Sequence, residues 1–404
     1  MATPERAPIQ PASRTHDITY AVRDIVVLAR EVARGGRELL YLNIGDPNQF
    51  DFETPAHLVE AVHRAMCDNH NGYSASEGIP DAVEAIRRQA ARSGITGVRD
   101  IFVSTGASEA IEIALTALAE PGDNILTPSP GYPLYTAVLS KLGVHNNPYY
   151  LDEANGWQPD LDDLAHKINA RTRAIVIINP NNPTGSVATR ETLQGLAKLA
   201  IERNLVVFSD EIYDKLILGD AQHVSIASLN PDLCCLTFNG LSKSYLAPGF
   251  RIGWSISSGP EKQLRPFIDA MQKITRARLC ANHPMQFAIA PALDGDQSHL
   301  VEVKRKLTAR RDLTVRMLNE IPGVSCVKPR GAFYAFPRIE LGVEDKPFVE
   351  DMLRATGVVC VHGSGFGQKP GTAHFRIVFL PPEDVLTRSY QAMATFVASC
   401  PPRA

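Results

Sequence analysis

Apolar residues first recur at helical spacing and later form short continuous runs. Over Ile18–Ala33 they return every three or four positions, which predicts an amphipathic helix that ends at Gly35-Gly36. Over Asp100–Ile256, short apolar runs alternate with helical patterns. Such alternation is typical of a largely parallel sheet covered by helices, so the pattern predicts an α/β fold.

The pattern changes in the last third of the chain. It is helical from about Pro260 to Asn319, with a break near Pro284, and then returns to short elements. Strands are expected at 324–327, 332–336, 358–361 and 375–379, and helices at 347–356 and from 382 onward. We therefore expect a large domain over 51–290, a smaller α+β domain formed by 17–50 and 291–404, and a flexible N-terminal arm over 1–16.

Three apolar runs of the large domain are followed by polar side chains. The runs 174–179, 205–208 and 234–238 have the composition of buried strands. The polar residues that follow them are Asn182, then Asp210 with Tyr213, then Ser242 with Lys243. Successive positions lie 28 and 33 residues apart, about one strand–helix–strand unit of ~30 residues. Because ligands of open α/β sheets bind at the carboxyl ends of strands, these side chains are expected to converge.

Lys243 and Arg251 place an amine and a phosphate-binding cation on one loop. An amine forms a Schiff base with an aldehyde, and a guanidinium holds a phosphate bidentately. The pair therefore fits pyridoxal phosphate, with Lys243 bound to the aldehyde carbon and later moving the α-proton. Asp210 would pair with the pyridinium nitrogen and keep it protonated, which makes the ring an electron sink.

The other polar residues at the strand ends complete this interpretation. Tyr213 and Asn182 are expected to hydrogen-bond the phenolate oxygen, and Ser242 is expected to bind the phosphate together with Arg251. Three of the assigned residues also have ordinary explanations: Asp210 as a helix cap, Tyr213 as a core aromatic residue, and Asn182 as a turn residue. Their occurrence together, in this order and at this spacing, favours the cofactor site.

Two further positions indicate anion binding. Gly106-Ala107-Ser108 follow the expected strand 101–104 at a helix start, where free N–H groups and the helix dipole favour a phosphate. An ordinary helix cap explains these three residues equally well. Arg376 lies within the apolar strand 375–379, where a buried arginine needs an anionic partner.

Several segments carry a resemblance to a known family. Three of them are Asn181–Gly185, Asp210–Tyr213 and Ser242–Gly253. On these segments the chain resembles, over nearly its whole length, the class I/II (fold type I) pyridoxal-phosphate-dependent aminotransferases. Three further runs resemble the bacterial alanine (glutamate–pyruvate) aminotransferases, namely Leu42–Gly45, Phe238–Lys243 and Gly323–Gly331.

The resemblance implies the fold and more of the cofactor site. The fold would be a large domain with a mostly parallel seven-stranded sheet and a smaller α+β domain. The resemblance also implies that Gly106-Ala107-Ser108 form the phosphate loop and that Tyr132 stacks on the cofactor ring. Tyr73 would reach the phosphate of the neighbouring subunit, which implies a homodimer with shared active sites.

The substrate contacts come from the same resemblance. Arg376 would bind the α-carboxylate, for which the planar fork of arginine is suited, and Gly45 and Asn182 would lie against the substrate. Tyr20 and Arg23, spaced i and i+3 on the first helix, resemble a Tyr-x-x-Arg pair that would bind the second carboxylate of glutamate. A solvated helix face explains this pair nearly as well.

The expected activity is transfer of an amino group from an L-amino acid, alanine before others, to 2-oxoglutarate in a ping-pong reaction. The alternatives are a lyase, of the carbon–sulfur β-lyase or cyclopropane-forming type, and an aminotransferase that prefers aromatic amino acids or aspartate. A transcription regulator built on this domain is excluded because residues 1–16 cannot hold a helix–turn–helix. One departure from the wider family is Gly240, which stands where a hydroxyl residue commonly contacts the phosphate.

Composition limits the partners of the chain. Its 404 residues, with 44% hydrophobic and 21% charged side chains, are typical of a soluble globular protein. A net charge of −3 gives no electrostatic basis for binding nucleic acid or acidic membranes, and no apolar run reaches the ~18 residues of a membrane span. The seven cysteines and 11 histidines lack ligand spacing, so neither disulfides nor a metal site are expected. With no signal-peptide pattern in residues 1–16, we expect a cytoplasmic protein.

Overall fold

The computed structural model describes residues 9–16, 18 and 21–400, and its largest element is an eight-stranded sheet with the order β2-β9-β8-β7-β6-β3-β4-β5. Its strands are β2 (Val98–Thr105), β3 (Asn124–Ser129), β4 (His145–Asp152), β5 (Gln158–Pro159), β6 (Thr172–Ile178), β7 (Val206–Asp210), β8 (Cys235–Gly240) and β9 (Ile252–Ser258). Strand β9 runs antiparallel to both neighbours, whereas β8, β7, β6, β3 and β4 pair in parallel. The predicted mostly parallel sheet of seven strands is confirmed, and the two-residue β5 extends its edge.

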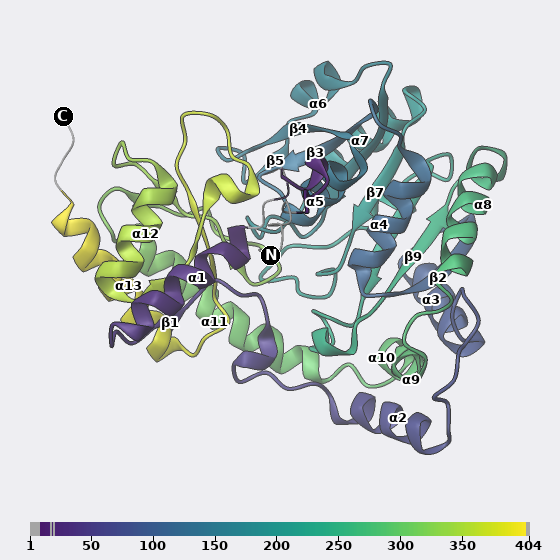
Figure 1. Cartoon of the computed structure of the whole chain (residues 1–404), viewed down its shortest axis with the longest axis horizontal. Coiled ribbons are helices and arrows are strands. Elements are labelled where there is room, and N and C mark those ends of the chain that lie inside the picture. The colour runs from purple at the N-terminus through teal and green to yellow at the C-terminus, as the bar shows by residue number, and fades with distance from the viewer. Residues whose placement is uncertain (1–8, 17, 19–20, 401–404) are drawn as a thin grey trace, which may run out of the picture.

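Helices cover both faces of this sheet (Figure 1). They are α4 (Ala107–Leu118), α5 (Pro133–Leu142), α6 (Leu161–Lys167), α7 (Arg190–Glu202) and α8 (Glu261–Ala277). Alternate residues of β6 show the two-sided burial, since Val176 packs in the cluster with α4 and α8, and Ile177 packs in the cluster with α7. A strand that is buried on both faces needs apolar residues at every position, which accounts for the continuous run in the sequence.

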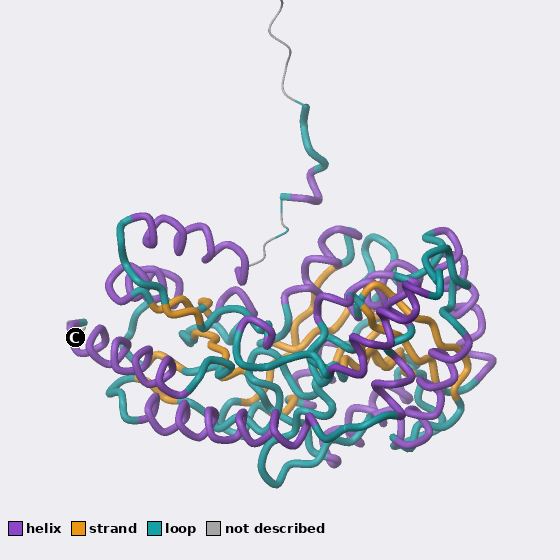
Figure 2. The backbone as a smooth tube through the Cα atoms, turned by 90° about the horizontal axis from the view of Figure 1, so that it is seen from below, coloured by secondary structure: helices purple, strands orange, loops and turns teal. Residues whose placement is uncertain are grey.

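The remaining elements form a second group with smaller sheets, and the strands gather in two groups in the view of Figure 2. The helices are α1 (Ala21–Arg34), α11 (His299–Asn319), α12 (Asp345–Thr356) and α13 (Glu383–Ser399). The strands are β1 (Leu40–Tyr41), β10 (Val324–Ser325), β11 (Tyr334–Ala335), β12 (Arg338–Ile339), β13 (Val358–Val359), β14 (Val361–His362) and β15 (Phe375–Val378). Figure 1 places α1 beside α12, although the two helices are far apart in the sequence.

The strands of this second group are shorter than the apolar runs predicted. The expected strand 332–336 contains only the two residues of β11, although all five of its residues are buried. Burial of an apolar run therefore does not require that each residue pairs in a ladder. Among the residues that the structure describes, no helix is long and apolar enough to cross a membrane.

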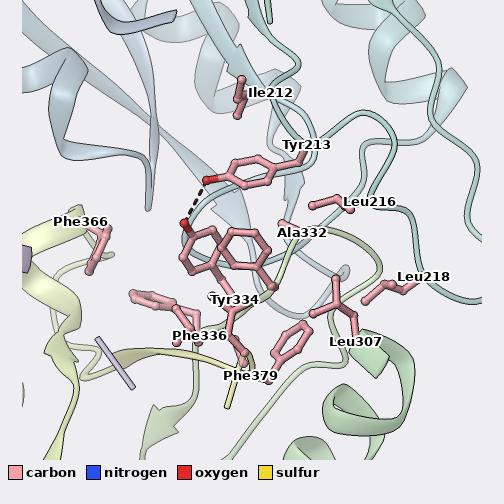
Figure 3. Packing of buried hydrophobic residues seen from close by; sticks show 14 of the residues in the cluster. Ile212, Tyr213, Leu216, Leu218, Leu307, Ala332, Tyr334, Phe336, Phe366 and Phe379 are labelled. Atoms are coloured by element: carbon pink, nitrogen blue, oxygen red, sulfur yellow. Dashed lines mark hydrogen bonds between the residues drawn. The ribbon is translucent and has the colours of Figure 1, made fainter. Parts of the chain in front are cut away.

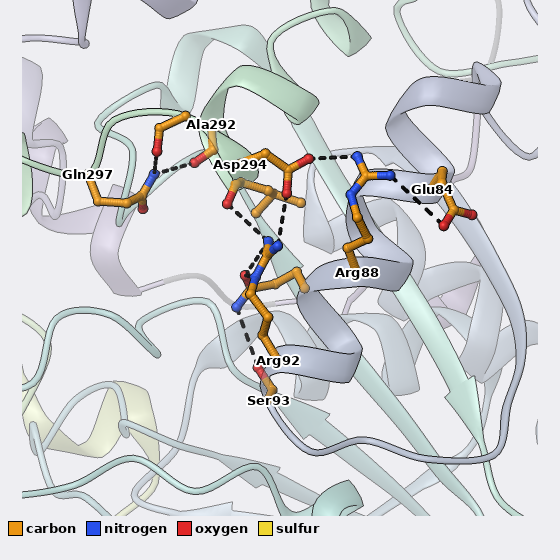
Figure 4. Close-up of polar contacts among 10 residues, drawn as sticks. Glu84, Arg88, Arg92, Ser93, Ala292, Asp294 and Gln297 are labelled. Atoms are coloured by element: carbon orange, nitrogen blue, oxygen red, sulfur yellow. Dashed lines mark hydrogen bonds and ion pairs between the residues drawn. The ribbon is translucent and has the colours of Figure 1, made fainter.

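A third set of helices packs at the β2 edge of the large sheet. It consists of α2 (Ala56–Cys67), α3 (Pro80–Arg92), α9 (His283–Gln286) and α10 (Ile289–Asp294). Asp294 accepts hydrogen bonds from Arg88 at 2.6 Å and from Arg92 at 3.0 Å, which joins α3 to α10 (Figure 4). The hydrogen bond from Arg88 is the main reason that the pKa of Asp294 is lowered. These groups are largely solvated, so the contact orients the two helices more than it stabilises the fold.

Candidate active site

A cavity of about 220 Å³ lies at the carboxyl ends of β6, β7 and β8, where the large sheet meets the second group of elements. Eleven of the residues predicted for the site line it, namely Gly45, Ala107, Ser108, Tyr132, Asn182, Asp210, Tyr213, Ser242, Lys243, Arg251 and Arg376. A larger and more open hollow of about 1340 Å³, beside α12, contains none of them. The sequence-distant strand ends therefore do converge, as their spacing predicted.

Lys243 follows β8 in a tight turn and is partly exposed at the cavity that it lines. Its Nζ donates to the carbonyl oxygen of Gly45 at 2.7 Å and lies 5.7 Å from the centre of the Phe333 ring. Burial lowers the pKa of Lys243 to about 8, with Asp46 acting in the opposite direction. An amine in this environment is neutral in an appreciable fraction of molecules near neutral pH, so it can act as a nucleophile and as a base.

Asp210 is the last residue of β7 and is 4% exposed. Its Oδ1 accepts the N–H of Ile212 at 3.3 Å, and its Oδ2 accepts the Tyr135 hydroxyl at 3.4 Å. Burial raises the pKa of Asp210 to about 6, although both hydrogen bonds act to lower it. Residues 212–215 form a turn rather than a helix, so the alternative in which Asp210 caps a helix is wrong. A carboxylate this deeply buried needs a cationic partner in the cavity when it is ionised.

Tyr213 lies in the turn after Asp210 and is not only a core residue, because its hydroxyl faces the cavity residue Tyr334. The two hydroxyl oxygens are 2.9 Å apart (Figure 3). Burial, and then the neighbouring Tyr334, raise the pKa of Tyr213 well above its ordinary value, so the phenol keeps its proton. Tyr334 was not predicted from the sequence, because it stands in an apolar run that reads as a core strand.

Arg376 lies in β15 and is 2% exposed. Its Nη1 donates to Oδ1 of Asn182 at 3.2 Å, and its Nη2 donates to the carbonyl oxygen of Asn43. The guanidinium carbon lies 4.8 Å from the centre of the Tyr334 ring and 4.6 Å from that of Phe366. Two aromatic faces and two oxygen acceptors fix the plane of the guanidinium, which suits bidentate binding of a carboxylate.

The start of α4 forms an anion-binding corner next to Arg251. Helix α4 begins at Ala107, and Gly106 precedes it with φ 75° and no side-chain cap. Nη2 of Arg251 donates to Oγ of Ser108 at 3.2 Å and lies close to the carbonyl oxygen of Thr105. The positive φ favours glycine, and a Cβ at position 106 would lie 2.5 Å from this nitrogen, so the Arg251 side chain would have to move. Uncapped N–H groups beside a guanidinium favour a phosphate.

Gly45 and Gly240 are glycines because other atoms occupy the space of a side chain. A Cβ at Gly45 would lie 2.2 Å from the Tyr334 hydroxyl oxygen. A Cβ at Gly240 would lie 2.6 Å from the carbonyl oxygen of Ile252 in the adjacent strand β9. The close approach of β8 and β9 therefore explains why this chain departs from the hydroxyl residue common at that position.

Gly106 and Tyr73 are predicted site residues that do not line the cavity, although Gly106 directly precedes Ala107, which does. Tyr73 is 82% exposed in the loop after α2 and does not line the cavity. Tyr20 lies outside the described residues, and Arg23 lies in α1, with its side chain outside the described part of the chain.

Comparison with known proteins identifies the family. Residues 37–388 match the model of "Aminotransferase class I and II". The chain is 41% identical over 401 residues to the glutamate-pyruvate aminotransferase AlaA of Escherichia coli K12, covering 97% of this chain and 98% of the relative. It is 42% identical over 398 residues to an alanine aminotransferase of Mycobacterium tuberculosis H37Rv, covering 96% of this chain and 92% of the relative.

The solved structures agree with the sequence comparison. An alanine aminotransferase from Pyrococcus furiosus superposes with a TM-score of 0.93 at 42% identity, covering 97% of this chain and 100% of that chain. An aminotransferase from Escherichia coli superposes with a TM-score of 0.94 at 40% identity, over 98% of this chain and 100% of that chain. The chain therefore belongs to the class I and II aminotransferases, a family that implies the use of pyridoxal phosphate.

Proposed function

We propose that the protein transfers the amino group of L-alanine to 2-oxoglutarate, giving pyruvate and glutamate, with pyridoxal phosphate as the cofactor. One observation carries the chemistry: Lys243, with its lowered pKa, and the buried Asp210 line the same cavity as Arg376. The choice of alanine rests on the relatives, whose names are alanine and glutamate-pyruvate aminotransferases.

The residues of the cavity fit this cofactor. The start of α4 with Ser108, Arg251 and Ser242 suits the phosphate, and Asp210 suits the ring nitrogen. Tyr213 and Asn182 suit the phenolate oxygen, and Tyr132 suits a ring face. Pyridoxal phosphate supplies an aldehyde that takes the amino group and a ring that withdraws electrons from the α-carbon.

The residues of the chain then have distinct tasks. Asp210 is ionised above about pH 6, and its charge keeps a proton on the ring nitrogen. Lys243, with a pKa of about 8, can accept the α-proton as a neutral amine and return it as an ammonium. Arg376 would hold the α-carboxylate in one plane, in the same cavity as Lys243. We further propose that Tyr20 and Arg23 bind the second carboxylate of glutamate.

We also propose that the protein works as a homodimer in the cytoplasm. Tyr73 is 82% exposed. The sulfur of Cys280 accepts the N–H of Ser74 in the Tyr73 loop, so Leu279, which precedes Cys280, lies next to this loop. Leu279 is itself 52% exposed, which supports a partner that covers this surface. All seven cysteines are unpaired, which supports a reducing compartment.

Complementation between two impaired variants tests the shared site. In a Lys243→Ala and Tyr73→Phe hybrid dimer, one active site keeps Lys243 of one chain and Tyr73 of the other. Mixing the unfolded variants and refolding them together should restore up to about a quarter of wild-type activity, because half of the dimers are hybrids with one intact site each. If the hybrid is no more active than the Tyr73→Phe protein alone, Tyr73 does not serve the partner.

A panel of amino donors tests the proposed reaction. With 2-oxoglutarate as acceptor, kcat/KM for alanine should exceed the values for aspartate and phenylalanine by at least about tenfold, since side-chain size in a closed pocket discriminates by that order. Initial-rate plots for the two substrates should be parallel lines, as a ping-pong reaction requires. A much better aspartate or aromatic donor would contradict the assignment of alanine and leave the family unchanged.

Two controls separate the other outcomes of the panel. The Arg376→Lys variant keeps the charge and loses the fork, so kcat/KM should fall by about tenfold or more for every donor while the order of donors is preserved. Release of ammonia and pyruvate from cysteine without any keto acid would favour the lyase alternative.

A further inference from the structure

The hydrogen bond between Tyr213 and Tyr334 has a direction that the proposed function fixes. We propose that Tyr334 is a positioning residue whose hydroxyl donates to Tyr213, so that Tyr213 donates its own proton to the phenolate oxygen of the cofactor. The ring of Tyr334 at the same time holds the guanidinium of Arg376. This inference rests on the proposed function, since it assigns a proton within the same site.

Only one proton can lie between two hydroxyl oxygens that are 2.9 Å apart. A Tyr213 that donated to Tyr334 would have no proton left for the cofactor. Both hydroxyls must therefore be protonated, and Tyr334 must be the donor within the pair. The raised pKa of Tyr213, caused first by burial and then by Tyr334, is consistent with a phenol that keeps its proton.

The position of Tyr334 is fixed by the backbone and by packing. Tyr334 pairs with Val378 across β11 and β15, and Arg376 lies on β15 two residues before Val378. The guanidinium carbon of Arg376 is 4.8 Å from the Tyr334 ring centre. The Tyr213 ring meets the Tyr334 ring edge to face, with centres 5.7 Å apart and planes at 90° (Figure 3). One side chain thus contacts both the proposed carboxylate clamp and the proposed phenolate donor.

Gly45 makes room for the hydroxyl of Tyr334. A Cβ at position 45 would lie 2.2 Å from this oxygen, and the carbonyl of Gly45 accepts the Lys243 amine at 2.7 Å. The hydroxyl therefore occupies a slot whose size the backbone sets. This arrangement supports a specific role for the Tyr334 hydroxyl as a hydrogen-bond donor, rather than a role in packing alone.

The test is a pH titration of the visible absorbance of the cofactor-loaded protein. A hydrogen bond donated to an anionic oxygen favours the deprotonated form, so weakening it raises the pH midpoint. Tyr334→Phe removes the hydroxyl and keeps the ring, and it should raise the midpoint by roughly 0.5 pH unit. Its affinity for propionate, a carboxylate probe of Arg376, should equal that of the wild type. Tyr334→Leu removes the ring too, and it should raise the midpoint and weaken propionate binding severalfold.

A double-mutant cycle shows whether Tyr334 acts through Tyr213. In a Tyr213→Phe background, adding Tyr334→Phe should leave the midpoint unchanged, because the Tyr213 hydroxyl through which Tyr334 acts is already absent. An equal rise in that background, or no rise in the wild-type background, overturns the inference. A wild-type protein that binds no cofactor would instead overturn the proposed function, so the two failures are distinguishable.

Discussion

The Lys243→Ala variant should lose turnover by about 10⁴-fold or more, because a general base typically contributes 10²–10⁴-fold and the covalent contact to the cofactor is lost as well. Steady-state rates with alanine and 2-oxoglutarate measure the first loss. Mass spectrometry after borohydride reduction measures the second, since the wild type should carry one pyridoxal phosphate adduct on the Lys243 peptide and the variant none.

Lys304→Ala provides the matched control. Lys304 lies on α11, is half-buried, and has a pKa that burial lowers, yet it does not line the cavity. This variant should keep both activity and adduct. An adduct on another lysine in the wild type would refute the assignment of Lys243.

The same amine predicts the pH dependence of cofactor capture. Only the neutral amine attacks an aldehyde, and deprotonation increases as the pH rises through the pKa of about 8. The rate at which the apoprotein captures pyridoxal phosphate should therefore rise up to about pH 8 and then level off.

The Asp210→Asn variant should weaken cofactor binding and yet stabilise the apoprotein. Loss of one partner of a buried charge pair costs about 2–5 kcal/mol, so activity should fall by about thirtyfold to several thousandfold. In the apoprotein the acid is unfavourably buried, and the shift of its pKa from 3.8 to about 6 corresponds to up to about 3 kcal/mol. Calorimetry of the apoprotein and of the cofactor-loaded protein at pH 7.5, for the wild type and the variant, tests these two opposite effects.

The pH dependence of this stabilisation of the apoprotein follows from the number of protons that Asp210 binds in the folded and unfolded states. Between about pH 4 and pH 6 the folded state holds a proton on Asp210 that the unfolded state has released, so this group lowers stability as the pH rises. The stability that Asp210→Asn adds to the apoprotein should therefore be absent near pH 4 and complete above about pH 6.

Glu211→Gln is the neighbouring control for this variant. Glu211 is also buried, but its Oε1 accepts hydroxyl hydrogen bonds from Ser209 and Ser225 at 2.8 Å, and it does not line the cavity. Cofactor affinity should therefore survive this change. Equal losses in both variants would contradict a specific role for Asp210.

The part of the site that lies on the large sheet could be predicted because strand ends share one edge. Asn182, Asp210 and Lys243 lie at or just after the carboxyl ends of the parallel neighbours β6, β7 and β8, so the position of each in the chain fixes its position in space. Tyr334 could not be predicted in this way. It lies in a two-residue strand of the other group, and only the packing of that group against the sheet turns it toward Tyr213.

The close approach of two backbone segments also could not be predicted from the sequence pattern. The departure at Gly240 is explained by the closeness of Ile252 on the neighbouring strand, which the local sequence does not encode. The role proposed for Tyr73 requires a second chain, so neither the sequence pattern nor a single protomer tests it.

The strand order has a consequence for synthesis on the ribosome. Strand β2 is translated first among the eight, but among the described residues its only neighbour in the sheet is β9, which is translated last. The nascent chain must therefore keep β2 outside the growing sheet until β9 emerges from the exit tunnel. Gly106, directly after β2, and Arg251, just before β9, then come together when β9 joins the sheet, so the anion-binding corner is built only when the sheet is finished.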